Sequence, residues 1–152
     1  DSVEFNYPKN KNVKILKGIS LEAPKNQVVA IVGHSGSGKA SIMSLIQRFY
    51  DPVEGRVLYS GQDIKEVDNS WYHQTQIAYV QQEPILFSTS IRENILYGVD
   101  FKDADEAQIE QRLRQACQQA NCLGFIENQD EFPDGFETLV GERGVRLSGG
   151  QK

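Results

Sequence analysis

The spacing of apolar residues divides the chain into a strand-rich first part and a helical second part. Short apolar segments bounded by turn-forming residues predict strands at residues 3–7, 14–23, 27–32, 56–59 and 77–80. Within them, residues 28–32 and 77–80 are continuously apolar and largely β-branched or aromatic, which is typical of strands covered on both faces in a parallel sheet. Strict alternation fails within 14–23, so we expect a β-bulge near Gly18.

Helical spacing begins directly after the third of these strands. Over residues 39–49 the apolar positions recur at the spacing of one helix face, at Ile42, Leu45, Ile46 and Phe49. The Asp51-Pro52 step is expected to end this helix, because the residue before a proline is driven toward extended backbone. A strand, a glycine-rich turn and a helix therefore follow one another without interruption.

A second, longer helix is predicted over about residues 104–123. Its apolar stripe consists of Ile109, Leu113, Ala116, Cys117 and Ala120. Asp103 or Asp105 is placed to cap its N-terminus and Gly124 its C-terminus. The acidic stretch 128–137 contains a proline and a glycine and predicts a surface loop.

Composition limits the function classes. The 152 residues, 39% of them apolar, suffice for one modest domain. The net charge of -5 argues against binding nucleic acid through a broad basic face. No apolar run approaches the ~20 residues of a membrane-spanning helix, and no signal segment opens the chain. Any membrane role is expected to come from a partner or from sequence outside these residues.

Cysteines and histidines do not predict a metal site. Cys117 and Cys122 lack a second Cys or His pair at metal-ligand spacing, which favours free thiols in a reducing compartment. His34 and His73 have no matching Cys or carboxylate spacing either, and are interpreted as solvated loop or turn residues.

The most specific local motif is the glycine-rich turn at residues 33–39, which has the spacing G-x-x-x-x-G-K. Glycines let the backbone wrap an anion with its N–H groups, the following helix N-terminus adds positive potential, and Lys39 supplies a mobile charge for terminal phosphates. A simple Gly/Ser-rich turn is the alternative. A buried-type strand before the turn and an amphipathic helix after it favour a nucleoside triphosphate site.

One position departs from this motif. The residue after the lysine is ordinarily Ser or Thr, whose hydroxyl binds Mg²⁺, and here it is Ala40. A methyl group cannot ligate magnesium. Ser41 is a doubtful substitute because one helical step rotates it by about 100°. Nucleotide binding is therefore better supported than efficient hydrolysis.

Further motifs occur in the order found in one family. They are Phe5-Asn6-Tyr7-Pro8, Arg48-Phe49-Tyr50-Asp51-Pro52, Gln82-Glu83-Pro84, Ile91-Arg92-Glu93-Asn94-Ile95 with Tyr97-Gly98, Gly141-Glu142-Arg143-Gly144, and Leu147-Ser148-Gly149-Gly150-Gln151. With the phosphate loop, they resemble the A-loop, Walker A, Q-loop and signature of the nucleotide-binding domain of ATP-binding cassette (ABC) transporters. The chain is most similar to multidrug-resistance and half-transporter exporters.

The resemblance implies an α/β fold, a P-loop NTPase with a RecA-like core, an antiparallel β subdomain and a helical signature subdomain. Residues 1–152 would be a truncated form of that domain, with the β subdomain and P-loop core at 1–84 and the helical subdomain at 85–152. The Walker B strand with its catalytic glutamate, the D-loop and the switch histidine would follow Lys152. Hydrolysis by this chain alone is accordingly predicted to be near background.

The resemblance also assigns the site. Catalytic roles would belong to Lys39 and Gln82. The ATP-binding residues would be Tyr7, Gly33, His34, Ser35, Gly36, Ser37, Gly38, Lys39, Ala40, Ser41 and Gln82. The signature residues that would contact the ATP of a partner domain are Leu147, Ser148, Gly149, Gly150 and Gln151. Tyr7 would stack on adenine, although a core tyrosine at the end of a strand is the alternative. Mg²⁺ would be held loosely, by phosphates, water and Gln82.

The implied function is that of the ATP-binding module of a membrane exporter, with ATP and Mg²⁺ as cofactors. Its partners would be a second nucleotide-binding domain, joined head to tail, and transmembrane domains, with this domain on the cytosolic or matrix side and no nucleic acid bound. A hydrolysis-impaired regulatory and dimerisation module is the alternative. A soluble ABC protein of DNA repair or translation is disfavoured by the acidic balance and by the exporter-type block at residues 82–98. A P-loop kinase or GTPase is disfavoured by the signature and by the lack of an Asn-Lys-x-Asp run.

Overall fold

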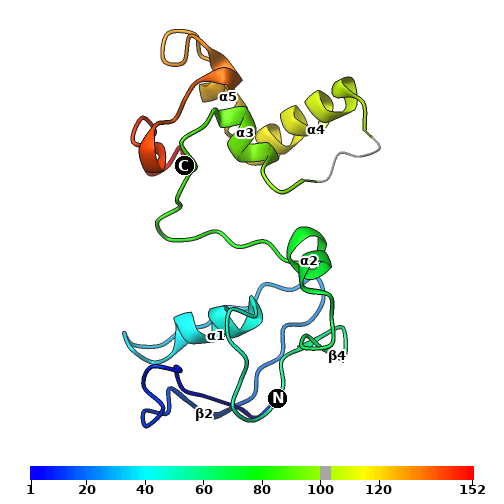
Figure 1. Ribbon diagram of the computed structural model, residues 1–152, viewed down its shortest axis with the longest axis vertical. Coiled ribbons are helices and arrows are strands. Elements are labelled where there is room, and N and C mark those ends of the chain that lie inside the picture. Colours follow the sequence, from blue (N-terminus) through cyan, green and yellow to red (C-terminus); the bar gives the residue numbers. More distant parts are fainter. Residues whose placement is uncertain (100–103) are drawn as a thin grey trace. The chain divides into compact units, whose positions relative to one another are not determined.

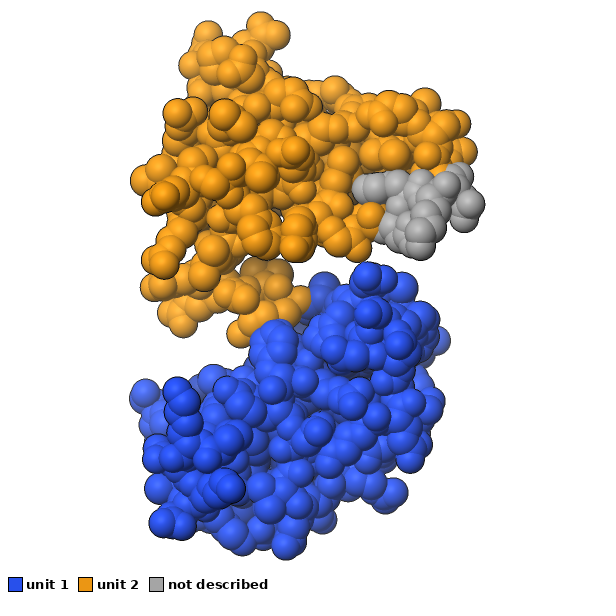
Figure 2. All heavy atoms as spheres, viewed as in Figure 1, with its two compact units in different colours: residues 1–78 blue, residues 79–152 orange. Residues whose placement is uncertain are grey.

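The computed structural model describes residues 1–99 and 104–152. The chain separates into two compact units, Asp1–Ala78 and Tyr79–Lys152, which Figure 2 shows in different colours. Each unit has its own cluster of buried side chains. Across these described ranges, no helix has both the length and the apolarity to cross a lipid bilayer.

The first unit is built on an antiparallel hairpin of β1 (Val3–Phe5) and β2 (Leu16–Ile19) (Figure 1). Val3 lies opposite Ile19 and Glu4 opposite Lys17. This register leaves Gly18 as an extra residue on β2, with a φ of 82°. The predicted bulge near Gly18 is therefore confirmed, and the strands are shorter than the predicted 3–7 and 14–23.

Helix α1 (Lys39–Ile46) packs Leu45 against this hairpin, in a cluster with Val3, Phe5 and Leu16. The helix was expected to continue to Phe49, and that expectation is wrong. Arg48 adopts a positive φ of 54°, and its guanidinium donates hydrogen bonds to the carbonyls of Val67 and Lys65. The chain leaves the helix there, and Phe49 is 60% exposed instead of lying on a buried face.

The rest of the first unit consists of short elements. β3 (Leu58–Tyr59) and β4 (Gln62–Asp63) form a second antiparallel hairpin, and α2 (Asn69–Trp71) runs into the π-helix η1 (Tyr72–Gln76). The Tyr72 hydroxyl donates to the Ile46 carbonyl over 2.9 Å. His73 is half-buried and stacks on Phe49 at an interplanar angle of 8°, so its interpretation as a solvated residue is wrong.

The two predicted parallel strands, 27–32 and 77–80, are not formed. Both segments are irregular, and the described strands form two antiparallel hairpins, with a further single bridge from Glu4 of β1 to Glu54. Val28 is fully exposed, and Val32 and Val80 are each 90% exposed. An isolated strand leaves its backbone N–H and C=O groups unpaired and its side chains uncovered, and neither segment pairs with a described strand.

The second unit is helical, with five short or medium elements among its described residues, 79–99 and 104–152. They are α3 (Ile91–Leu96), α4 (Glu106–Gln119), α5 (Leu123–Ile126), and the 3₁₀ turns η2 (Gly135–Glu137) and η3 (Glu142–Gly144) (Figure 1). Their shared core contains Ile91, Leu113, Cys117, Ile126, Phe132, Val140 and Leu147. Leu147, the first residue of the signature, is thereby anchored by the helical core.

Helix α4 begins as predicted and ends earlier than predicted. Asp105 caps its N-terminus in a capping box with Gln108, while the alternative cap, Asp103, lies outside the described residues. The helix stops at Gln119 because Asn121 takes a φ of 57°, and Gly124 lies inside α5 instead of capping α4. The predicted surface loop at 128–137 contains one core residue, Phe132, which is 4% exposed.

Candidate nucleotide-binding site

The glycine-rich turn lies at the start of α1, as its sequence predicts. Gly38 is the N-cap of the helix, and Lys39 is its first residue. The Lys39 ammonium donates hydrogen bonds to the carbonyls of Gly33, over 2.7 Å, and His34, over 2.8 Å. The loop therefore curls back around the ammonium group and holds it near the N-terminus of α1.

The electrostatics of this turn favour an anion. The first turn of a helix leaves N–H groups without acceptors inside the helix, and the aligned peptide dipoles add positive potential there. The first turn of α1 has no acidic residue to neutralise that potential, and Lys39 adds a full positive charge. The residues from Gly33 to Gly36 are exposed, so a phosphate group can reach the loop from solvent.

His34 lies in this exposed part of the loop, as a solvated residue should. One of its ring nitrogens, Nδ1, is 2.8 Å from the Ser35 carbonyl. Because a carbonyl oxygen only accepts, Nδ1 carries the proton in this arrangement and donates it. The imidazole is thus held close to the loop backbone.

The β1–β2 hairpin packs closely against the glycine-rich turn at Gly38. A Cβ atom added at Gly38 would lie 2.7 Å from Leu16 Cδ2 and 3.5 Å from Ile15 Cγ2. Gly38 also has a φ of 92°, in the left-handed region that favours glycine. The position therefore needs glycine both for its backbone conformation and for the close approach of β2.

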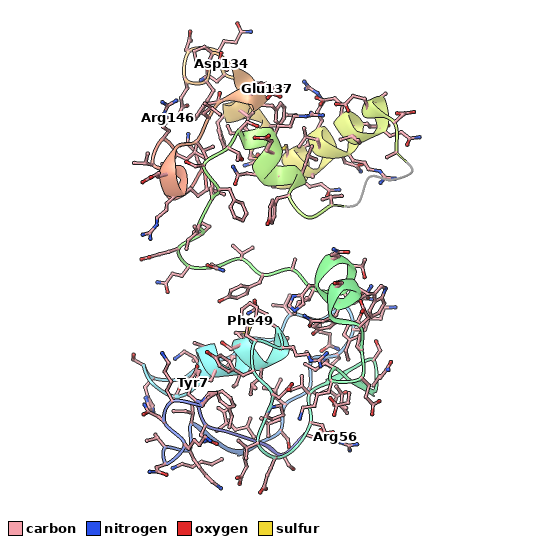
Figure 3. All side chains as sticks on the ribbon, in the orientation of Figure 1. Tyr7, Phe49, Arg56, Asp134, Glu137 and Arg146 are labelled. Carbon is pink, nitrogen blue, oxygen red and sulfur yellow. The ribbon has the colours of Figure 1, made fainter. Side chains whose placement is uncertain are left out.

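Tyr7 lies next to the start of α1 (Figure 3). Its hydroxyl is 2.9 Å from the Ser41 hydroxyl, and its ring meets the rings of Phe5 and Tyr50 edge to face, with centroids 4.9 Å and 5.2 Å away. The structure thus brings two predicted site residues, 34 positions apart, into contact. Tyr50 belongs to the family motif at residues 48–52 and is not among the predicted site residues; its contact with Tyr7 is a tertiary one that no local spacing encodes.

The side chains around this turn do not fit a bound Mg²⁺ ion. Ala40 is exposed and carries no oxygen, and Ser41 is 5% exposed with its hydroxyl already engaged by Tyr7. Within residues 1–99 and 104–152, no group of three or more His, Cys, Asp or Glu side chains is arranged to hold a metal. Gln82, the ligand that the family resemblance suggested, belongs to the second unit.

In the second unit, the signature begins at a helical turn. The Ser148 hydroxyl accepts from the Gln151 N–H over 3.3 Å, and the Gln151 side chain accepts from the Ser148 N–H over 2.9 Å. This reciprocal pair has the pattern of a capping box. Ser148, Gly149 and Gly150 are exposed, whereas Leu147 is buried. The polar end of the signature is thus open to a ligand, and its apolar end fixes it to the core.

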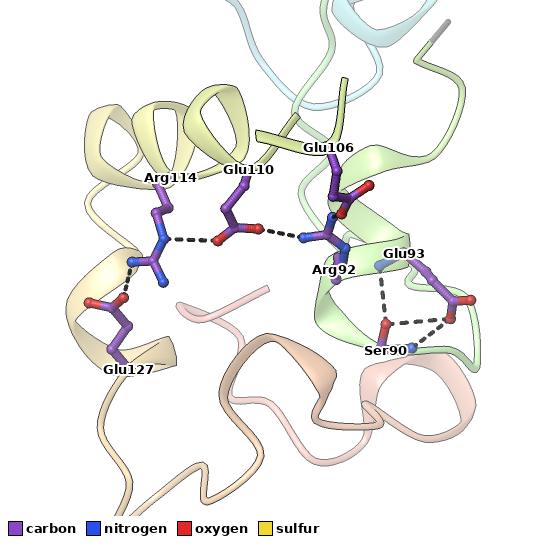
Figure 4. A network of polar contacts seen from close by, with 7 residues as sticks. All are labelled: Ser90, Arg92, Glu93, Glu106, Glu110, Arg114 and Glu127. Atoms are coloured by element: carbon purple, nitrogen blue, oxygen red, sulfur yellow. Dashed lines mark hydrogen bonds and ion pairs between the residues drawn. The ribbon is translucent and has the colours of Figure 1, made fainter. Parts of the chain in front are cut away.

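A chain of ion pairs joins the helices of this unit (Figure 4). Arg92 on α3 contacts Glu106 at 2.5 Å and Glu110 at 2.6 Å on α4, and Glu110 also accepts from Arg114 at 2.8 Å. Arg114 in turn pairs with Glu127 at the end of α5. This network is not among the features predicted from the sequence, although the i,i+4 spacing of Glu110 and Arg114 on one helix indicates their pair.

The pKa values within the network follow its geometry. The hydrogen bond from Arg92 lowers the pKa of Glu110, with partial burial opposing it and Arg114 adding to it. The pKa of Arg92 is raised, chiefly by its hydrogen bond to Glu110. Both groups are therefore charged over the whole neutral range, and they tie α3 to α4.

Comparison with known proteins gives a single answer. The sequence matches the family described as "ABC transporter" over residues 16–152. "ABC transporter B family member 1" of Arabidopsis thaliana is 51% identical over 151 residues, which cover 99% of this chain and 11% of that protein. "ABC transporter B family member 1" of Dictyostelium discoideum is 47% identical over 150 residues, which cover 99% of this chain and 15% of that protein. The chain therefore spans only a small part of the length of these relatives.

A solved structure agrees with the sequence comparisons. The structure titled "Structure of a bacterial Atm1-family ABC exporter with ATP bound" matches with a TM-score of 0.84 and 41% sequence identity, and covers 100% of this chain and 25% of that chain. The fold class expected from the motifs, the P-loop NTPase domain of an ABC protein, is thereby confirmed. The family match covers nearly all of the residues, from β2 through the phosphate loop to the signature. The chain belongs to the ABC transporter family.

Proposed function

We propose that this chain is the ATP-binding module of an ABC-type membrane exporter. The observation that carries the proposal is the phosphate loop at the N-terminus of α1, with the Lys39 ammonium enclosed by the carbonyls of Gly33 and His34. The similarity to ABC transporter B family members and to an Atm1-family exporter supports the same function. ATP would bind with its phosphates on residues 33–41 and its adenine against Tyr7.

The residues of the loop account for phosphate binding. The unpaired N–H groups at the start of α1 and the glycine backbone would donate to phosphate oxygens. Lys39 would exchange its two carbonyl acceptors for the β- and γ-phosphates, which are stronger acceptors because they are charged. We assign the second catalytic role, orientation of the attacking water, to Gln82, which is exposed in the second unit.

The module would act in a pair. The exposed Ser148, Gly149 and Gly150 would contact the ATP of a second nucleotide-binding domain arranged head to tail. Residues 1–84 would supply the phosphate loop and residues 85–152 the signature. Closure of the pair would be passed to transmembrane domains, with this module on the cytosolic or matrix side of the membrane.

A hydrolysis-impaired regulatory module is the second candidate, and one observation favours it. Ala40 has no hydroxyl, and the hydroxyl of Ser41 is buried against Tyr7. Turnover by the full-length protein at saturating MgATP separates the two candidates. Turnover that depends on Lys39 and Gln82 supports the exporter ATPase, whereas nucleotide-dependent dimerisation without turnover supports the regulatory module.

Binding itself is tested by calorimetric titration of the chain with ATP, comparing the native sequence with Lys39→Ala and Lys25→Ala. Lys25 is exposed and lies outside the loop, so it controls for the loss of one positive charge. Lys39→Ala should weaken binding by about tenfold or more, the equivalent of one charged hydrogen bond, while Lys25→Ala should leave it unchanged. Equal binding by all three proteins would contradict the proposed site.

A further inference from the structure

We infer that the first turn of α1 offers Mg²⁺ no ligand, so that the affinity of this chain for ATP is nearly independent of Mg²⁺. A single hydroxyl at position 40 would restore the dependence. This inference rests on the proposed nucleotide binding and deepens it. It concerns what the side chains at positions 40 and 41 present to the ion that ordinarily accompanies ATP.

Position 40 faces solvent at the mouth of the phosphate loop. Its side chain is exposed and lies directly after Lys39, the residue that carries the loop's charge. Alanine has neither a donor nor an acceptor atom there. Because the site is open, a serine or cysteine of nearly the same size can be introduced without displacing a neighbour.

Ser41 cannot supply the missing Mg²⁺ ligand, because its hydroxyl is already hydrogen-bonded to Tyr7. The side chain is 5% exposed, on the face of α1 that meets the hairpin, and its oxygen is 2.9 Å from the Tyr7 hydroxyl. Tyr7 is in turn fixed by the rings of Phe5 and Tyr50. Turning the Ser41 oxygen toward a metal at the loop would break this hydrogen bond and leave the Tyr7 hydroxyl without that partner.

The consequence for affinity follows from thermodynamic linkage. The factor by which Mg²⁺ changes ATP affinity equals the factor by which the protein changes the affinity of ATP for Mg²⁺. Mg²⁺ needs six oxygen ligands in near-ideal octahedral geometry and gives up its waters reluctantly. If the protein contributes no oxygen ligand, Mg²⁺ has the same phosphate and water ligands in the protein complex as in free MgATP. Mg²⁺ then leaves the ATP affinity nearly unchanged, and the protein leaves the affinity of ATP for Mg²⁺ nearly unchanged.

The experiment compares ATP affinity in excess EDTA with ATP affinity in millimolar Mg²⁺, using calorimetric titration of the full chain. Four variants accompany the native protein. Ala40→Ser adds a hard oxygen ligand, and Ala40→Cys is the matched control because its thiol has similar size and is a poor ligand for Mg²⁺. Ser41→Ala removes the hydroxyl next to position 40, and Gln82→Ala removes the side-chain amide that the family resemblance assigns to the ion. Mn²⁺ binding to each ATP complex, followed by electron paramagnetic resonance, reports the metal directly.

The native protein and Ala40→Cys should bind ATP equally with and without Mg²⁺, within about twofold. Ala40→Ser should bind about tenfold or more tightly with Mg²⁺ than without it, the size typical of a ligand-shell change at a metal site. A native dependence on Mg²⁺ as strong as that of Ala40→Ser would overturn the inference. Ser41→Ala or Gln82→Ala would then identify the true ligand by abolishing it.

Two further outcomes are informative. Ala40→Ser without any Mg²⁺ dependence would also overturn the inference, because position 40 would then not be where the ion binds. No ATP binding by any variant under either condition would instead refute the proposed function. Failure of the metal inference and failure of nucleotide binding are therefore distinguishable.

Discussion

Replacing Gly38 with alanine should destabilise the first unit, because the phosphate loop packs closely on the hairpin at this position. Two costs are expected. Alanine in the left-handed region costs about 1–2 kcal/mol relative to glycine. The new Cβ would also approach Leu16 Cδ2 to 2.7 Å, and Leu16 is only 1% exposed, so it has little room to move. Overpacking of this kind costs about 1–3 kcal/mol, which brings the total to about 2–5 kcal/mol.

Gly36→Ala is the matched control. Gly36 also has a positive φ, of 80°, but an added Cβ would meet nothing within 4 Å. It should therefore show the backbone cost alone, about 1–2 kcal/mol. Alanine restricts the unfolded chain equally in both variants, so this effect cancels in the comparison. The difference between the two variants measures the contact with Leu16.

The assay is urea unfolding followed by fluorescence of the single tryptophan, Trp71, which lies in the first unit. Gly38→Ala should lose about 1–3 kcal/mol more unfolding free energy than Gly36→Ala. In a Leu16→Ala background that excess should shrink, because the clashing methyl group is gone. Equal destabilisation by the two glycine variants, or an excess that persists without the Leu16 side chain, would refute the reasoning.

Three predictions concern the second unit. Arg92→Met should lower its unfolding free energy by about 0.5–1 kcal/mol, allowing for the exposure of both partner carboxylates, and Arg92→Lys by less; urea unfolding followed by circular dichroism measures both. Because the pKa of Glu110 is lowered, its ionised form stabilises the fold above the ordinary value of about 4.3, and this stabilisation is lost as pH falls through the lowered value. Urea midpoints measured at descending pH should therefore fall more for the native protein than for Glu110→Gln, and parallel decreases would contradict the assignment. Burial, with the contact to Cys122, raises the pKa of Cys117 to about 12, so iodoacetamide at pH 8 should alkylate Cys122 first; peptide mapping that found Cys117 modified first would contradict its burial.

Local sequence was sufficient for features whose partners lie within a few residues. The phosphate loop, the start of α1 at Lys39, the Asp105 cap and the bulge at Gly18 each depend on backbone geometry over one or two turns. That geometry can be predicted directly from glycine spacing, from a capping side chain and from a break in the alternation of apolar residues. The family was readable for the same reason, because each of its motifs is a short, contiguous run.

Features that need a distant partner could not be read in this way. Residues 27–32 have the composition of a buried strand, but a strand forms only where another chain segment accepts its hydrogen bonds and covers its side chains. The early end of α1 depends on Arg48 reaching carbonyls 17 and 19 residues away. The hydrophobic pattern predicts which residues can be buried, but it does not predict which chain segments will cover them.

The phosphate loop shows both kinds of information at one site. The sequence by itself predicts an anion site at residues 33–39, since the helix N-terminus, the glycines and Lys39 are all local. It also determined that Ala40 cannot ligate a metal. Only the tertiary structure decided the role of Ser41, because the partner of its hydroxyl is Tyr7, which packs with the β1–β2 hairpin against α1. A hydrogen bond between residues 34 positions apart has no local signal, and it decides which oxygen atoms this site can offer.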